Sequence, residues 1–244
     1  MCLKALVKSG GNEMRLIGLS DEKGQIRVDF GGCNMKCPYC VHIHQPVKEW
    51  TVDEVMDYAS KSSTENVYLG GAEPTLQKDL LPLIEELHRA GKRVILKSNG
   101  MKPDILELAF PFLHGFVLEI KAPSDDIKGI MELTGMSEER STKYVGLLKE
   151  SLFIAKKKWL RIWIRVVPEY VNADTMPRIL PDLEGASEVM LYQFMSNPDF
   201  DLPFMGHDKP APSWRIIKSL GETVVKTVPL VRVVGERGQI LLKE

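Results

Sequence analysis

The stretch QIRVDFGGCNMKCPYC, residues 25–40, decides the fold class. Its first part, Gln25–Phe30, has the Ile, Val and Phe content of a buried strand and ends at a pair of glycines. Three cysteines then follow within eight residues, at positions 33, 37 and 40. In parallel α/β folds, the loops at the carboxyl ends of the strands carry the chemistry. The stretch therefore indicates an α/β protein with a cysteine-bearing site at its strand ends.

Five further strand-like runs follow, and helical patterns separate them. They are rich in Val, Ile, Leu and Phe, as parallel strands buried on both faces are. Six βα units of this kind predict a partial parallel (βα)6 barrel with right-handed crossovers. The five runs are residues 66–69, 94–98, 116–120, 160–167 and 189–194.

The helical patterns carry start and stop signals. Thr51 and Glu54 have the spacing of a capping box. Asp79 can cap the next helix, and Gly91 follows its last apolar residue. Three longer or later helices are predicted at residues 138–157, 175–183 and 213–225.

The length of 244 residues points to a single domain. We expect an N-terminal extension over residues 1–24, with a β hairpin in it, and a barrel core over residues 25–194. A C-terminal loop and helix are expected over residues 195–244. Residues 196–212 are rich in Pro and Asp, which predicts a loop over the site that helps to select the substrate.

Composition excludes several classes of protein. The net charge of −1 gives no electrostatic reason to expect nucleic acid as a partner. No segment approaches the ~20 apolar residues of a membrane span, and the N-terminus lacks the apolar region of a signal peptide. We therefore expect a cytoplasmic protein without a membrane partner, in a compartment where thiols stay reduced.

The cysteine spacing favours a metal site over a disulfide framework, because three of the four cysteines are crowded on one short loop. Thiolates from Cys33, Cys37 and Cys40 can bind three corners of a 4Fe–4S cluster and leave the fourth iron open. The alternative is a zinc site in which His42 or His44 supplies a fourth ligand. The second CxxC-like half of the usual zinc pattern is missing.

A resemblance to a known family becomes specific at this point. CxxxCxxC with an aromatic residue before the last cysteine resembles the signature of the radical S-adenosylmethionine (SAM) superfamily, and the match extends over about residues 25–194. Residues 70–75, GGAEPT, resemble the GGxEP element that binds the methionyl amino group of SAM in that family. The resemblance implies Gly70, Gly71, Glu73 and Pro74 as SAM-binding residues. Alone, the hexapeptide could be a tight turn.

Two more elements of the SAM site are implied by their place in the barrel. Tyr39 matches the aromatic residue near adenine, although an aromatic side chain there could instead shield a cluster from water. Residues 97–100, KSNG, resemble the TNG-like turn near the ribose. This implies Ser98 and Asn99 at SAM, whereas the alternative is a plain Asn-Gly turn.

The next two strands end in charged residues that the resemblance also places at SAM. Glu119-Ile120-Lys121 resembles the DLK element of glycyl-radical-enzyme activases, which implies Glu119 and Lys121 at the SAM site. Lys121 could instead be a solvated lysine at a strand end. Arg165 is a candidate partner for the SAM carboxylate, because guanidinium binds carboxylates bidentately. A structural salt bridge is the alternative for Arg165.

The resemblance implies a cofactor set and a reaction. One 4Fe–4S cluster, reduced by flavodoxin or ferredoxin, would cleave SAM to a 5′-deoxyadenosyl radical that abstracts a hydrogen atom from a substrate. Only Cys2 remains outside the motif, so a second cluster with its own cysteines is excluded. The chain is most similar in kind to the activating enzymes of pyruvate formate-lyase and anaerobic ribonucleotide reductase, whose substrate is a backbone glycine of a partner enzyme.

Two positions depart from those activases. Val41 stands where they usually carry His, and Lys97 stands where they tend to have an acidic residue. In some activases that acidic residue binds a monovalent cation near SAM. We expect the Lys97 ammonium to replace such a cation, or else to point outward and pair with a surface carboxylate.

Two alternative functions remain open. One is a small-molecule radical SAM enzyme of the 7-carboxy-7-deazaguanine synthase type. The other is a zinc-binding interaction protein without catalysis. Anaerobic purification separates them, because an iron–sulfur protein is brown and a zinc protein is colourless.

Overall fold

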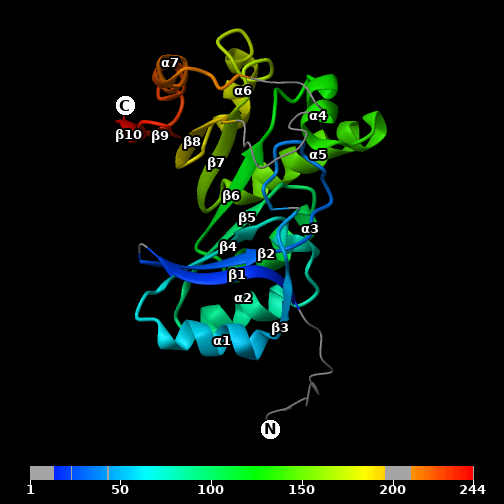
Figure 1. The fold of residues 1–244 in the computed structure, drawn as a ribbon, viewed down its shortest axis with the longest axis vertical. Helices are drawn as coiled ribbons and strands as arrows, with labels where there is room; N and C mark the ends of the chain where they lie inside the picture. The colour runs from blue at the N-terminus through cyan, green and yellow to red at the C-terminus, as the bar shows by residue number, and fades with distance from the viewer. Residues whose placement is uncertain (1–13, 23, 43, 196–209, 244) are drawn as a thin grey trace.

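The computed structural model describes residues 14–22, 24–42, 44–195 and 210–243, and these contain one mixed sheet of ten strands. The strand order is β10-β9-β8-β7-β6-β5-β4-β2-β1-β3 (Figure 1). In this order, neighbouring strands from β9 through β4 to β2 pair in parallel. At the two edges, β10 pairs antiparallel with β9, and β1 pairs antiparallel with β2 and with β3. The parallel strands are β2 (Gln25–Phe30), β4 (Asn66–Gly71), β5 (Arg93–Ser98), β6 (Gly115–Ile120), β7 (Trp159–Val166), β8 (Glu188–Gln193) and β9 (Leu230–Gly235). The edge strands are β1 (Met14–Glu22), β3 (Lys48–Trp50) and β10 (Gly238–Lys243).

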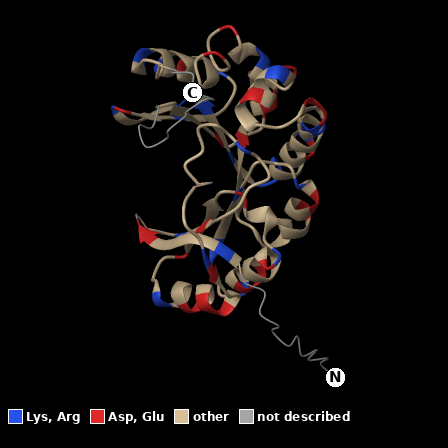
Figure 2. Cartoon of the chain, turned by 45° about the vertical axis from the view of Figure 1, so that its right-hand side comes forward, with Lys and Arg blue, Asp and Glu red and all other residues tan. Residues whose placement is uncertain are grey.

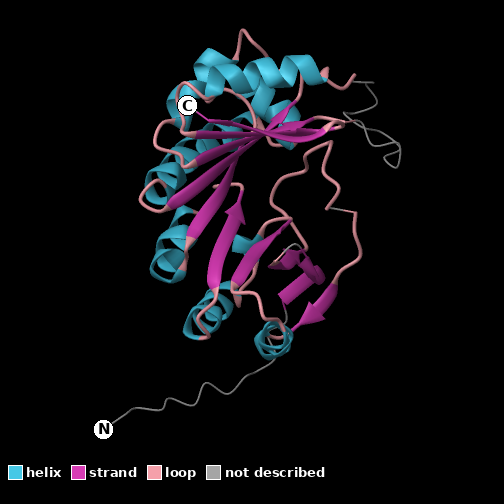
Figure 3. Ribbon diagram, turned by 90° about the vertical axis from the view of Figure 1, so that its left-hand side faces the viewer, coloured by secondary structure: helices cyan, strands magenta, loops and turns pink. Residues whose placement is uncertain are grey.

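Helices cover the outer side of the curved sheet and leave its inner side to the loops (Figure 3). The described strands do not close into a barrel, because their order ends at β10 on one edge and at β3 on the other. The helices are α1 (Val52–Lys61), α2 (Leu80–Arg89), α3 (Pro103–Ala109), α4 (Ile127–Thr134), α5 (Glu138–Ala155), α6 (Met176–Leu183) and α7 (Trp214–Val224). Two 3-10 turns are η1 (Pro74–Leu76) and η2 (Phe110–Phe112).

Residue alternation along the strands separates an apolar outer face from a polar inner face. Val28, Leu96, Leu118, Ile162 and Val189 are fully buried in the core between the sheet and the helices. Each such side chain contributes roughly 1.5–3 kcal/mol to folding. Their sequence neighbours point the other way, since successive side chains of a strand alternate between the faces. Charged and aromatic residues occupy many of those inner positions, and some of the others are aliphatic.

The six predicted strands and the predicted helices are confirmed, with bounds that differ by one or two residues. Thr51 Oγ1 accepts a hydrogen bond from Glu54 N, and Glu54 Oε2 accepts one from Thr51 N, so the capping box at α1 is present. Asp79 does precede α2, but its side chain makes no capping bond. Gly91 follows α2 with φ of 76°, a conformation that glycine adopts without strain.

The ends of the chain differ from the expectation in one respect. The C-terminal helix is present as α7, but two strands that were not predicted, β9 and β10, follow it and extend the sheet. The expected N-terminal hairpin exists in part, because β1 pairs antiparallel with β2 around Gly24. Residues 1–13, with Cys2, and residues 196–209 of the predicted loop lie outside the described residues.

The outer surface agrees with the balanced composition. Basic and acidic residues lie side by side on the helices (Figure 2). Within the described part of the chain, none of the helices has both the length and the apolar character needed to span a bilayer.

Candidate functional site

The cysteine loop leaves β2 and lies over the carboxyl ends of the parallel strands. Cys33, Cys37 and Cys40 are free thiols on this one loop. Burial raises the pKa of Cys33 to about 11 and also raises the pKa of Cys37. Three soft thiol ligands that share one loop and one cavity fit an iron–sulfur cluster, which would displace their protons on binding.

The described part of the loop contains no preformed mononuclear zinc site. Among the described residues, no three His, Cys, Asp or Glu side chains are placed to hold one metal ion. Burial and the nearby Lys97 ammonium lower the pKa of His42, and its Nδ1 atom is buried without a partner. A cluster places different demands on the loop, because each thiolate binds a separate iron.

Two helices hold the cysteine loop in place. The Lys36 amide donates to the Thr134 carbonyl over 2.8 Å, and Arg140 Nη2 donates to the Asn34 carbonyl over 2.9 Å. Gly135, at the end of α4, has φ of 66°, and a Cβ there would lie 2.8 Å from the Lys36 carbonyl oxygen. Glycine is therefore required for this close approach between α4 and the loop.

Glu73 is a fully buried carboxylate that joins three loops. Its Oε1 atom accepts from Thr75 and from Ser98 Oγ, and its Oε2 atom accepts from the Asn99 amide over 2.7 Å. Asn99 Nδ2 in turn donates to Asn34 Oδ1 on the cysteine loop over 2.7 Å. Both carboxylate oxygens are thus used within the protein, which makes Glu73 the residue that orients the turn after β4.

The turn after β4 also requires Gly71. Its φ is 82°, and a Cβ at this position would lie 2.6 Å from both the amide nitrogen and the carbonyl oxygen of Phe30. Any side chain would push the turn away from β2. Gly71 and Ala72 therefore reach the cavity beside the cysteines because the backbone packs closely against β2.

The ends of β5 and β6 carry a buried group of three charges. Lys121 Nζ lies 2.7 Å from one Glu119 oxygen, and Lys97 Nζ lies 4.0 Å from the other. Burial alone would raise the pKa of Glu119, but the ammonium groups of Lys121 and Lys97 outweigh burial and lower this pKa to about 2. Lys121 is not a solvated lysine, since its side chain is only 5% exposed. Lys97 likewise faces the interior, and its ion-pair partner among the described residues is the mostly buried Glu119.

Arg165, on β7, lies between two aromatic rings. Its guanidinium carbon is 5.2 Å from the centre of the Tyr39 ring and 5.3 Å from that of Tyr192. It forms no ion pair with any described residue, and its Nε atom is buried without a partner. The structural salt bridge considered for Arg165 is therefore not what the described residues show, and the guanidinium is available to an anion.

One cavity with about 630 Å³ of empty space, part of it open to solvent, brings most of the predicted site together. Four predicted residues do not line it: Gly70, Glu73, Pro74 and Ser98. Sequence reasoning missed Trp163, whose indole lies in the wall. The alternation Trp159, Arg161, Trp163, Arg165 along β7 was the available signal, because it puts two indoles and two guanidinium groups on one face. The predicted lining residues are Cys33, Cys37, Tyr39, Cys40, Gly71, Asn99, Glu119, Lys121 and Arg165.

Comparison with known proteins establishes the class. The family model of the Radical SAM superfamily matches residues 28–164, so the chain belongs to this superfamily. Membership implies a 4Fe–4S cluster and SAM as cofactors, and the three cysteines that would hold the cluster are present.

The individual proteins that the chain resembles share low sequence identity with it or match only a part of it. The chain is 24% identical over 234 residues to a Methanocaldococcus jannaschii protein named as a candidate glycyl-radical enzyme activating enzyme, with 93% of this chain and 94% of that protein covered. It is 41% identical over 76 residues to a 7-carboxy-7-deazaguanine synthase of Bacteroides thetaiotaomicron, with 31% and 41% covered. A crystal structure of a radical SAM methyltransferase from Sphaerobacter thermophilus has a TM-score of 0.62 at 16% identity and covers 88% of this chain and 68% of its own, which shows the fold.

We predict that Cys33→Ala abolishes cluster assembly, because the remaining two thiolates form a labile site. Iron content and visible absorption of the anaerobically purified variant measure this loss. Cys2→Ala is the matched control and should keep the full cluster. A complete, SAM-cleaving cluster in Cys33→Ala would show that the ligand assignment is wrong.

We predict that Glu73→Gln loosens the three loops that the carboxylate joins. The amide offers one acceptor oxygen where the buried carboxylate offers two, so a donor is left unpaired at a cost of about 1.5–3 kcal/mol in the free energy of unfolding. Chemical denaturation of the variant measures this. Glu107→Gln, at an exposed position on α3, is the control. Equal stability of Glu73→Gln and this control would contradict the role given to Glu73.

Proposed function

We propose that the protein uses SAM and its cluster to abstract a hydrogen atom from a substrate, and that this substrate is a backbone glycine of a partner enzyme. The proposal of a glycine substrate rests on similarity that extends over 93% of the chain. The relative named as a candidate glycyl-radical enzyme activating enzyme is covered for 94% of its length, and a second protein with that name is 27% identical over 197 residues.

The cysteine loop supports the radical chemistry. Cys33, Cys37 and Cys40 would hold three irons and leave the fourth free for SAM. When bound, the cluster and SAM supply the reductive cleavage that gives a 5′-deoxyadenosyl radical. Flavodoxin or ferredoxin is the reductant that we propose, in the cytoplasm.

The protein's own residues would bind SAM and keep water away. Lys121 and Arg165 offer positive charge to the SAM carboxylate from neighbouring strands of the cavity wall. Tyr39 is buried beside these cations, 5.4 Å from Lys121 Nζ and 5.2 Å from the Arg165 guanidinium carbon, where its ring limits access of water to the site. Glu73 fixes the turns after β4 and β5, so Gly71 and Asn99 in the cavity wall are held in one arrangement before SAM binds.

A small-molecule substrate is the second candidate. It is favoured by the local identity of 41% to a 7-carboxy-7-deazaguanine synthase and by the replacement of an activase-type acid by Lys97. This local match covers 31% of the chain, whereas the match to the first relative named as a candidate activating enzyme covers 93%, so the longer match carries more weight.

The test is anaerobic incubation with SAM, dithionite and the glycyl radical enzymes of the same organism. We expect a glycyl radical signal by electron paramagnetic resonance (EPR) and 5′-deoxyadenosine as the product. A partner whose target glycine is replaced by alanine is the control and should give no signal. Formation of 5′-deoxyadenosine without a glycyl radical in any partner would overturn the activase assignment and leave the radical SAM class intact.

A further inference from the structure

The inner face of the sheet carries more positive than negative charge. The buried and half-buried cations on the inner positions of β2 to β9 are Arg27, Lys97, Lys121, Arg161, Arg165 and Arg232. The acids there are Asp29, Glu119 and Glu188. Uncompensated charge in a partly buried wall is unfavourable, so this wall favours a ligand of negative charge.

Each of the three acids forms an ion pair with a cation of the same face. Asp29 pairs with Arg27 at 3.1 Å. Glu188 lies between Arg161 at 2.9 Å and Arg232 at 2.6 Å.

The remaining acid, Glu119, forms a close ion pair with Lys121 at 2.7 Å. Lys97 lies 4.0 Å from the same carboxylate, so Glu119 neutralises the positive charge of Lys97 only in part. Arg165 forms no ion pair with an acidic side chain among the described residues. The SAM carboxylate can use Arg165, and Lys97 is then left without an anion of its own.

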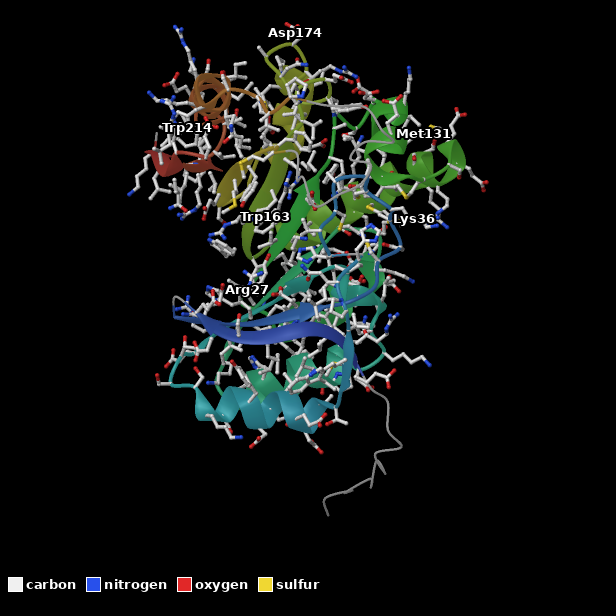
Figure 4. All side chains as sticks on the ribbon, in the orientation of Figure 1. Arg27, Lys36, Met131, Trp163, Asp174 and Trp214 are labelled. Carbon is white, nitrogen blue, oxygen red and sulfur yellow. The ribbon has the colours of Figure 1, made fainter. Side chains whose placement is uncertain are left out.

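Four side chains, two cationic and two aromatic, form a row on the inner face of the sheet: Lys97, Trp163, Tyr68 and Arg27. Its ammonium lies 5.4 Å from the centre of the Trp163 ring, which stacks on Tyr68 with 6.5 Å between ring centres. The Arg27 guanidinium covers the other side of this row, 4.8 Å from the Tyr68 ring centre. Arg27, on β2, and Trp163, on β7, are labelled in Figure 4. The row holds the ammonium and the indole in fixed positions, which lowers the entropic cost of binding a ligand.

Donors in this row lack partners. The Lys97 ammonium makes no hydrogen bond to any described residue, and its nearest carboxylate oxygen lies 4.0 Å away, although an ammonium has three donors. Trp163 Nε1 is buried and unpartnered, and so is the hydroxyl of Tyr68, a residue that is 4% exposed. Buried donors without partners cost free energy unless a ligand or water satisfies them. Lys97 and Trp163 line the same cavity as the cysteines, so such a ligand can lie beside SAM.

We infer that Lys97 and Trp163 form a subsite that binds an anionic group of the substrate, a carboxylate or a phosphate, through the ammonium and the indole N–H. The inference rests on the proposed radical function, since it places the substrate in the SAM cavity. The anion belongs either to an acidic side chain beside the target glycine or to a small molecule. The chemistry of recognition is the same in both cases.

The test measures binding to the anaerobic holoprotein with saturating SAM, by isothermal titration calorimetry. Two carboxylate probes are each compared with a neutral amide of the same shape. Benzoate is compared with benzamide, and a short glycine peptide with one aspartate is compared with its asparagine counterpart. We expect at least one carboxylate to bind more tightly than its amide, by about tenfold to a hundredfold for a charged hydrogen bond.

Variants of Lys97 and Trp163 test whether the preference for carboxylate over amide arises at the subsite. Lys97→Met should abolish the preference, and Lys97→Arg, which keeps the cation, should retain most of it. Trp163→Phe keeps the ring but removes the N–H, so it should weaken the preference in part. Lys61→Met, at an exposed position on α1, is the matched control and should bind the probes as the unchanged protein does. Thermal melting confirms that each variant is folded.

The outcomes separate the subsite from the activase proposal. Equal affinity for acid and amide, or a preference that survives in folded Lys97→Met, would overturn the subsite. Tighter binding of the aspartate peptide supports the subsite with a protein substrate. Tighter binding of benzoate alone supports the subsite with a small-molecule substrate, and the glycyl radical measurement above then decides the activase proposal independently.

Discussion

The Glu73 carboxylate is the interaction on which the site depends. It is fully buried at the end of β4, and its two oxygens accept from the turn after β4 and from the turn after β5. Through Asn99 the same connection reaches Asn34 on the cysteine loop. A buried carboxylate is costly unless its acceptors are satisfied, so the three loops are constrained to the one arrangement that satisfies them. Gly71, Ala72 and Asn99 of these turns line the cavity, so the arrangement fixes this part of its wall.

The sequence was informative wherever a feature is local. The capping box at Thr51 and the apolar runs of β2 and of β4 to β8 depend on residues a few positions apart, and these were predicted with the correct type and order. The cysteine spacing and residues 70–75 are also local, which is why the superfamily was recognised before the fold was known. The pairing of strands followed from the rules for parallel βα units.

Features that depend on distant contacts were not predictable in the same way. The strands β9 and β10 were missed, and only the pairing of β9 with β8 and of β10 with β9 shows that they extend the sheet. Glu73 was expected at SAM or at its turn, and its bonds to Ser98 and Asn99 join residues 25 and 26 positions apart. The inner position of Lys97 could not be distinguished from an outward one until Trp163 and Glu119 were seen beside it.

The central claim is that the three thiols hold a cluster whose open iron binds SAM. The most direct measurement is the EPR spectrum of the reduced, anaerobically purified protein with and without SAM. The account predicts the spectrum of a reduced 4Fe–4S cluster whose g values change when SAM is added. A colourless protein with bound zinc, or a cluster spectrum that SAM leaves unchanged, would contradict it.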